Sequence, residues 1–141
     1  MSSNVLYVGV MGYSDQGFDA TLAMKMLNEA FDIIQRESGR EVRIVSGYTN
    51  LGIPALAYQE AVRRGWKTVG VACNKAKDYD VFPCDKVIIV GEDWGDESQA
   101  FLAKCEVFIQ IGGGAQSHRE AEKAIKSGKA VFVYDLKSTN S

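Results

Sequence analysis

The chain has 141 residues, of which 46% are hydrophobic and 24% are charged, as expected for one ordinary globular domain. Its formal net charge is -2 and its basic residues are scattered, which gives no electrostatic reason to expect a nucleic-acid or membrane-surface partner. The N-terminus lacks a signal-peptide pattern, and no apolar run approaches the ~18 residues that span a membrane. We therefore expect a cytoplasmic, soluble protein with a single domain over residues 1–141.

Short apolar runs rich in β-branched residues recur along the chain, and helical patterns separate most of them. Runs that are apolar almost throughout are typical of parallel strands covered on both faces. The strands are expected at 4–12, 41–47, 67–73, 86–91, 106–113 and 129–135.

Helical spacing of apolar residues and suitable end residues indicate four helices between these strands. Only the segment 74–85 joins two strands without a convincing helix. The helices are expected from Asp19 to Gly39, from near Pro54 to Gly65, from about Asp96 to Cys105, and from near Ser117 to Gly128.

Alternating strands and helices imply right-handed crossover connections. The sequence therefore predicts an α/β, Rossmann-like fold, with an open, mainly parallel sheet of about six strands and helices on both faces. In such sheets, ligands bind at the carboxyl ends of the strands near the point where the strand order reverses.

Glycine and small polar residues collect where three of these strands end, in "GYSDQG", "SGYTNLG" and "GGGAQS". No GxGxxG fingerprint follows the first strand, and no GxxxxGK[ST] motif occurs, so NAD and ordinary NTPase chemistry lose support. The predicted ligand-binding residues are Gly12, Ser14, Ser46, Gly47, Gly52, Gly112, Gly113, Gly114 and Ser117.

Gly112, Gly113 and Gly114 stand between the fifth strand and the fourth helix. Backbone N–H groups at a helix N-terminus attract an anion, so these glycines suit a phosphate cradle. The alternative is a tight strand-to-helix turn that binds nothing.

Two segments, 46–71 and 106–124, resemble the lysine-decarboxylase-like, or LONELY GUY, family of cytokinin riboside 5'-monophosphate phosphoribohydrolases. "SGYTNLGIPALAYQEAVRRGWKTVGV" is similar to that family's glycine turn, helix and strand, and "EVFIQIGGGAQSHREAEKA" to its PGGxGTxxE signature. In that register, Glu120 falls on the signature's glutamate, and Ser117 replaces its threonine. Related groups with this fold include molybdenum-cofactor carrier proteins and sensor domains that bind nucleotides without hydrolysing them.

The resemblance implies a nucleoside phosphate or a related small molecule as the ligand. Glu97 stands where the family's hydrolases carry an arginine, so the cationic partner for Glu120 is missing. We therefore predict a protein that binds a nucleotide or nucleotide-like cofactor. The alternative, in which the chain is an enzyme, is a phosphoribohydrolase that cleaves the N-glycosidic bond of a nucleoside 5'-monophosphate. No resident cofactor is predicted.

Glu120 has a structural alternative to a catalytic role. Ser117 and Glu120 are three residues apart at the expected start of a helix, which is the spacing of a capping box. A functional Glu120 would instead bind the ribose hydroxyls or stabilise positive charge at the anomeric carbon.

Other chemistry-bearing residues are interpreted mainly as structural. His118 is expected to be a solvated helix residue, and the acids of 92–97 to follow the helix-dipole pattern without binding a metal. Tyr13, Tyr48 and Trp94 could stack on a base, although aromatic residues at loop edges more often just pack. Free, mostly buried thiols are expected at Cys73, Cys84 and Cys105.

The resemblance also implies a homo-oligomer, and a homodimer is the first expectation. The first helix carries apolar residues spread widely around it, which we expect not to face one sheet together. These residues are Met24, Met26, Leu27, Phe31 and Ile34.

Overall fold

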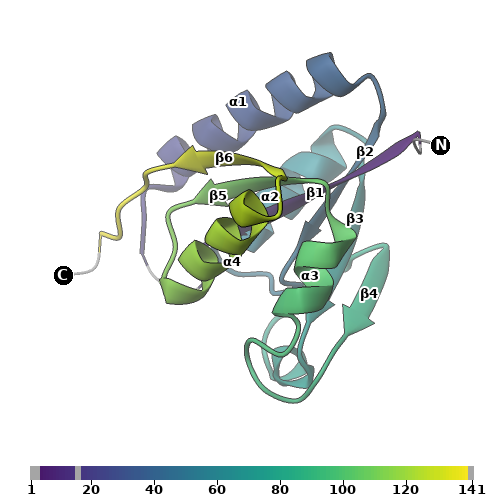
Figure 1. The fold of residues 1–141 in the computed structure, drawn as a ribbon. Coiled ribbons are helices and arrows are strands. Elements are labelled where there is room, and N and C mark those ends of the chain that lie inside the picture. The colour runs from purple at the N-terminus through teal and green to yellow at the C-terminus, as the bar shows by residue number, and fades with distance from the viewer. Residues whose placement is uncertain (1–3, 15–16, 140–141) are drawn as a thin grey trace.

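Six parallel strands form an open sheet in the order β4-β3-β2-β1-β5-β6, as shown by a computed structural model that describes residues 4–14 and 17–139 (Figure 1). The predicted fold class is confirmed, and every predicted strand is present within a few residues of its expected bounds. The strands are β1 (Val5–Gly12), β2 (Glu41–Ser46), β3 (Lys67–Ala72), β4 (Lys86–Ile89), β5 (Val107–Ile111) and β6 (Ala130–Tyr134).

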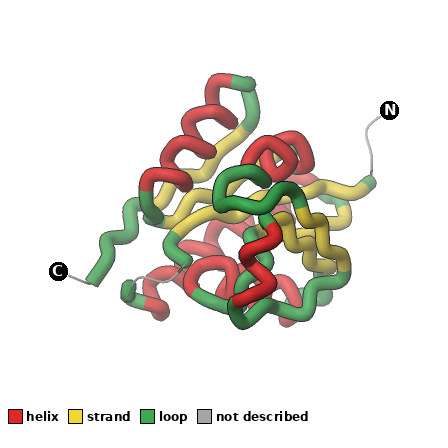
Figure 2. Tube along the Cα trace, turned by 90° about the horizontal axis from the view of Figure 1, so that it is seen from below, coloured by secondary structure: helices red, strands yellow, loops and turns green. Residues whose placement is uncertain are grey.

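Helices cover both faces of the sheet, as the views in Figures 1 and 2 show. One face packs against α1 and α2, and the other against α3 and α4. A short 3₁₀ helix (Asn74–Asp78) lies in the segment for which no α-helix was expected. The α-helices are α1 (Ala20–Ser38), α2 (Gly52–Arg63), α3 (Ser98–Lys104) and α4 (Ala115–Lys126).

The ends of α1 follow the predicted capping chemistry. The Asp19 carboxylate accepts a hydrogen bond of 3.1 Å from the backbone N–H of Leu22, which satisfies a free donor of the first turn. Gly39 ends the helix in a left-handed conformation with φ of 61°, which glycine adopts without a Cβ clash. None of the helices in the described part of the chain is long and apolar enough to cross a membrane.

The fourth helix begins two residues before Ser117, near its expected start, and this changes the place of Ser117 in the helix. α4 begins at Ala115 with Gly114 as its N-cap, and no side chain caps it. Ser117 therefore lies within the first turn and not at the N-cap, so the capping box with Glu120 does not form.

The argument that the apolar residues of α1 cannot face one sheet is also wrong. Leu27, Phe31 and Ile34 are buried in the core, and Met24 and Met26 pack partly buried against the same cluster. The spread of apolar residues on α1 is therefore no evidence for an oligomer.

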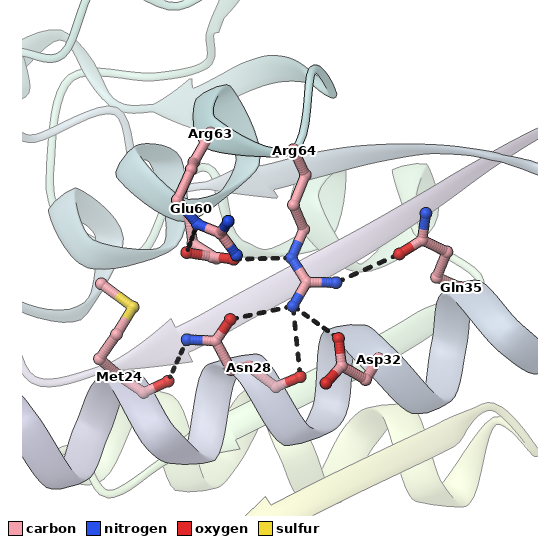
Figure 3. Close-up of polar contacts among 7 residues, drawn as sticks. All are labelled: Met24, Asn28, Asp32, Gln35, Glu60, Arg63 and Arg64. Carbon is pink, nitrogen blue, oxygen red and sulfur yellow. Dashed lines mark hydrogen bonds and ion pairs between the residues drawn. The ribbon is translucent and has the colours of Figure 1, made fainter.

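α1 and α2 are joined by a polar cluster around the guanidinium of Arg64, drawn in Figure 3. Arg64 donates to the buried carboxylate of Glu60 over 2.7 Å and to Asp32 on α1 over 2.7 Å. The guanidinium also lies over the rings of Phe31 and Trp66, at 5.5 and 5.2 Å from their centroids. The cluster therefore links two helices on the face opposite α3 and α4.

Candidate functional site

A cleft of about 440 Å³ opens at the carboxyl ends of β1, β2 and β3. Its walls come from the segment after β1, the start of α2, the N-terminal parts of α3 and α4, and the loops around Tyr79 and Trp94. The chain order turns at β1, because β2 lies on one side of it and β5 on the other. The cleft thus occupies the position at which open α/β sheets bind ligands.

Seven of the ten predicted site residues line this cleft, and three do not. The seven lining residues belong to three separate segments of the sequence, which the parallel sheet brings to one edge. The lining residues are Gly12, Ser14, Ser46, Gly47, Gly114, Ser117 and Glu120, and the three outside are Gly52, Gly112 and Gly113.

The three glycines outside the lining are required by the fold itself. Gly52, Gly112 and Gly113 all have positive φ angles, of 59°, 58° and 103°. A Cβ on Gly52 would lie 2.2 Å from the carbonyl oxygen of Tyr13, and one on Gly112 would lie 2.4 Å from that of Leu136. Their lack of a side chain is explained by backbone geometry and close packing, without a ligand.

Gly47 and Gly114 differ from those three glycines. Both line the cleft, neither has a positive φ, and a Cβ built on either would meet no atom within 4 Å. The fold therefore gives no steric reason for glycine at these two positions. A side chain there would extend into open space, which a ligand in the cleft can use for close approach to the backbone.

The N-terminus of α4 supplies backbone donors to the cleft. Gly114, Ala115, Gln116 and Ser117 all line it, and no side chain caps the helix. The first N–H groups of a helix have no partner within the helix, and the helix dipole places partial positive charge there. This end of the cleft therefore suits an anion.

The start of α2 reaches the same cleft but is a poorer anion site. Pro54 in its first turn has no N–H group, and the N–H of Ile53 donates to the carbonyl oxygen of Tyr13 over 2.7 Å. Two of its first-turn positions are therefore unable to donate to a ligand, so α4 is the better candidate of the two helix ends.

Glu120 is held by two side chains at the wall of the cleft. Ser98 Oγ donates to Glu120 Oε2 over 2.5 Å, and Gln116 Nε2 donates to the same oxygen over 3.3 Å. Oε1 has no hydrogen-bond partner among the described residues, yet it is not sealed from solvent. Since Glu120 lines the cleft, Oε1 is the oxygen available to a ligand.

Glu97 is the second buried carboxylate of the cleft, and sequence reasoning had not included it among the site residues. Glu97 is 7% exposed and Glu120 is 8% exposed. Both carboxylate oxygens of Glu97 accept from the backbone N–H of Gly95 at 3.1 Å. Burial raises the pKa of Glu120, and the nearby charge of Glu97 raises it further, against the hydrogen bonds from Ser98 and Gln116.

Aromatic side chains lie on the walls and at the mouth of the cleft. Trp94 and Tyr79 are about half exposed, with ring centroids 5.6 Å apart in an edge-to-face arrangement. Tyr13 also lines the cleft, and its hydroxyl donates to the carbonyl oxygen of Leu136 over 2.8 Å. Tyr48 is outside the lining and packs on Gly70, so of the three aromatic residues that could stack on a base only Tyr13 and Trp94 lie at the site.

The remaining residues singled out from the sequence have local partners. His118 is exposed, and its Nδ1 lies 3.0 Å from the amide nitrogen of Gln110. Asp96 accepts from the backbone N–H groups of Glu92 and Asp93, which holds the loop before α3. Within residues 4–14 and 17–139, no group of three or more acidic, histidine or cysteine side chains is arranged to hold a metal ion.

The cysteines agree with the expectation of free, mostly buried thiols. Cys73 and Cys105 are buried and Cys84 is half-buried, and all three are free. Burial raises the pKa of the Cys84 and Cys105 thiols, which keeps them protonated.

The fold and the cleft together define a Rossmann-like α/β protein with its candidate ligand site at the reversal point of the sheet. Residues 5–141 match the SLOG cluster4 family, and the chain belongs to that family. This confirms the predicted relationship to the lysine-decarboxylase-like and LONELY GUY superfamily. Among curated proteins, none matches the chain.

Two solved structures show the extent of the shared fold. The molybdenum cofactor binding protein of Rippkaea orientalis is 23% identical with a TM-score of 0.76, over 94% of this chain and 77% of that protein. The Moco carrier protein of Chlamydomonas reinhardtii is 25% identical with a TM-score of 0.67, over 92% of this chain and 75% of that protein. The chain is thus similar to both over nearly its whole length.

Proposed function

We propose that this protein binds a nucleotide or a nucleotide-like cofactor in the cleft, with a phosphate group of the ligand at the start of α4. The observation that carries the proposal is Gly114. It is the N-cap of an α-helix without a side-chain cap, it lines the cleft, and a Cβ added to it would point into open space. A phosphate can approach such a backbone closely and accept hydrogen bonds from several N–H groups.

Three further observations support a ligand of this kind. The cleft volume of about 440 Å³ falls within the usual range for small-molecule sites. Trp94 and Tyr79 offer aromatic surface at the mouth, on which a planar ring can stack. Proteins named for binding or carrying the molybdenum cofactor share the fold over more than nine-tenths of this chain.

A second candidate function is hydrolysis of the N-glycosidic bond of a nucleoside 5'-monophosphate. It is favoured by Glu120, which presents one unpartnered carboxylate oxygen to the cleft. It is disfavoured because no Lys, Arg or His is among the described residues that line the cleft, so no cationic side chain assists Glu120. We therefore rank binding above hydrolysis.

The proposal is tested by identifying whatever copurifies with the protein by mass spectrometry, followed by a thermal-shift panel of nucleoside mono-, di- and triphosphates. Ligand binding raises the melting temperature by mass action. In Gly114→Val the isopropyl group would fill the phosphate position, so the shift should disappear while the protein stays folded. An undiminished shift in folded Gly114→Val would overturn the phosphate position, and release of free base by the wild type would favour the hydrolase.

We also propose that the protein forms a homo-oligomer, with a homodimer as the simplest case. The proposal rests on the family resemblance. Light scattering at tens of micromolar protein tests it, and a monomer under those conditions would end the proposal.

A further inference from the structure

The charged groups of the cleft are unusual for a site that binds phosphate. Its described lining contains two carboxylates, Glu97 and Glu120, and no basic side chain. Neither carboxylate forms an ion pair with any residue of the described chain. The lysines and arginines that do form ion pairs pair with acids outside the cleft lining.

The positive end of the cleft is limited to backbone donors. The N-terminus of α4 carries about half an elementary positive charge, which favours a phosphate group beside it. The α2 N-terminus adds little, because Pro54 lacks an N–H group and that of Ile53 is already used. A second or third phosphate would find no basic side chain among the described residues that line the cleft.

The acidic end is built into the fold. Glu97 is fixed by the Gly95 N–H, and Ser98, the next residue, donates to Glu120, so the starts of α3 and α4 hold the two carboxylates together. Both side chains are more than nine-tenths buried, so water compensates their charge poorly. Glu120 Oε1, which has no partner in the described protein, remains open to a donor from the ligand.

We infer that Glu97, together with Glu120, selects the charge of the ligand: the cleft takes a molecule with one phosphate group and an uncharged or cationic hydrogen-bond donor, and rejects polyphosphates. This inference rests on the proposed function and narrows its ligand class. An anionic group beside two buried carboxylates is repelled by both of them. Hydroxyl, amino or amidinium groups instead donate to the open carboxylate oxygen.

The test compares adenosine and guanosine mono-, di- and triphosphates by calorimetric titration in EDTA, so that no metal ion bridges phosphate and carboxylate. The wild type should bind the monophosphate at least about tenfold more tightly than the triphosphate of the same base. Glu97→Gln should narrow this preference to about threefold or less, because it removes one of the two repelling charges. Glu97→Arg should reverse the preference, since the new guanidinium attracts the additional phosphates.

Glu122→Gln and Glu122→Arg are matched controls. Glu122 lies on α4 two residues after Glu120, but it is exposed and pairs with Lys126. The two controls change the net charge by the same amounts, but outside the cleft. They should leave the preference for the monophosphate over the triphosphate unchanged. Circular dichroism and melting curves establish whether each variant is folded. If Glu97→Arg does not fold, the comparison of the wild type with Glu97→Gln is sufficient for the test.

Different binding results would overturn this inference and the proposed function. Equal or tighter binding of triphosphates by the wild type, or equal changes in the Glu97 and Glu122 variants, would overturn the role of Glu97 while leaving nucleotide binding intact. If neither these nucleotides nor inorganic phosphate binds the wild type, the proposed function fails and the charge selection fails with it.

Discussion

Ser98 donates a hydrogen bond of 2.5 Å to Glu120, and this contact joins the start of α3 to the first turns of α4 at the wall of the cleft. The two residues are 22 positions apart, with β5 between them. Glu120 therefore belongs to an interhelical polar contact and not to the cap of its own helix, which changes what its substitution is expected to do.

The first prediction concerns the pH dependence of stability. The pKa of Glu120 lies above its ordinary value of 4.5, chiefly because burial disfavours the carboxylate. Folding thus favours the protonated form, so this contribution is fully present below about pH 4.5 and is lost as pH rises through the folded-state pKa. Glu120→Gln does not titrate and should lose less stability than the wild type between pH 4 and about pH 8.

Urea unfolding at both pH values measures the effect, with Glu122→Gln as the exposed control. Ser98→Ala provides a second comparison, because it removes a hydrogen bond that lowers the pKa of Glu120. It should steepen the loss of stability with pH and cost about 1 kcal/mol. Parallel pH profiles of stability in the wild type and Glu120→Gln would contradict the raised pKa of Glu120.

The second prediction separates two neighbouring glycines. Gly112→Ala places a Cβ at φ of 58° and 2.4 Å from the Leu136 carbonyl oxygen, so it should lose about 2 kcal/mol or more of unfolding free energy. Gly114→Ala has ordinary φ and open space, and its stability should stay within about 0.5 kcal/mol of the wild type. Chemical denaturation of both variants checks this, and equal losses would show that Gly114 is also required by the fold.

The fold was predictable from the sequence because its signals are local. The strands follow from runs of β-branched residues. The bounds of α1 follow from its end residues, Asp19 and Gly39, which act on backbone groups a few positions away. The glycine turns likewise indicated the correct edge of the sheet, since parallel strands bring their carboxyl ends together.

The details of the site depended on contacts between distant segments, which a pattern along the chain does not contain. The Ser117–Glu120 spacing suggested a cap, but Gly114 is the N-cap of α4, and Glu120 instead accepts a hydrogen bond from Ser98. Glu97 was noticed for the arginine it replaces, yet only the packed structure shows it buried in the cleft. Gly112 and Gly114 look alike in sequence, and only their φ angles and neighbours distinguish a folding requirement from room for a ligand.

The third prediction uses Trp94 as a reporter of binding. The chain has two tryptophans: Trp66 packs against Phe31 beside α1, and Trp94 lies half exposed at the mouth of the cleft. A planar base that stacks on Trp94 should quench its fluorescence, so Trp66→Phe should retain the ligand-dependent signal and Trp94→Phe should lose it. Titration of both variants with nucleoside monophosphates tests this, and a signal carried by Trp66 would place the ligand elsewhere.

The last prediction concerns the polar cluster between α1 and α2 in Figure 3. Arg64→Met keeps much of the apolar bulk beside Phe31 and Trp66 but leaves the buried Glu60 with Arg63 as its remaining ion-pair partner. Removing one partner of a buried pair is strongly destabilising, and the remaining Arg63 pair reduces the expected loss to about 2 to 3 kcal/mol. Arg63→Ala, at a side chain that is 66% exposed, should lose much less stability than Arg64→Met, because solvent screens an exposed ion pair. Urea unfolding at neutral pH compares the two variants with the wild type.

The same ion pairs should depend on pH. Since Arg63 and Arg64 lower the pKa of Glu60, their stabilisation of the fold is present above about pH 4.5 and is lost as pH falls through the folded-state pKa of Glu60. The gap between wild type and Arg64→Met should therefore shrink in acid, and a gap that is the same at low and neutral pH would show that Arg64 acts through packing alone.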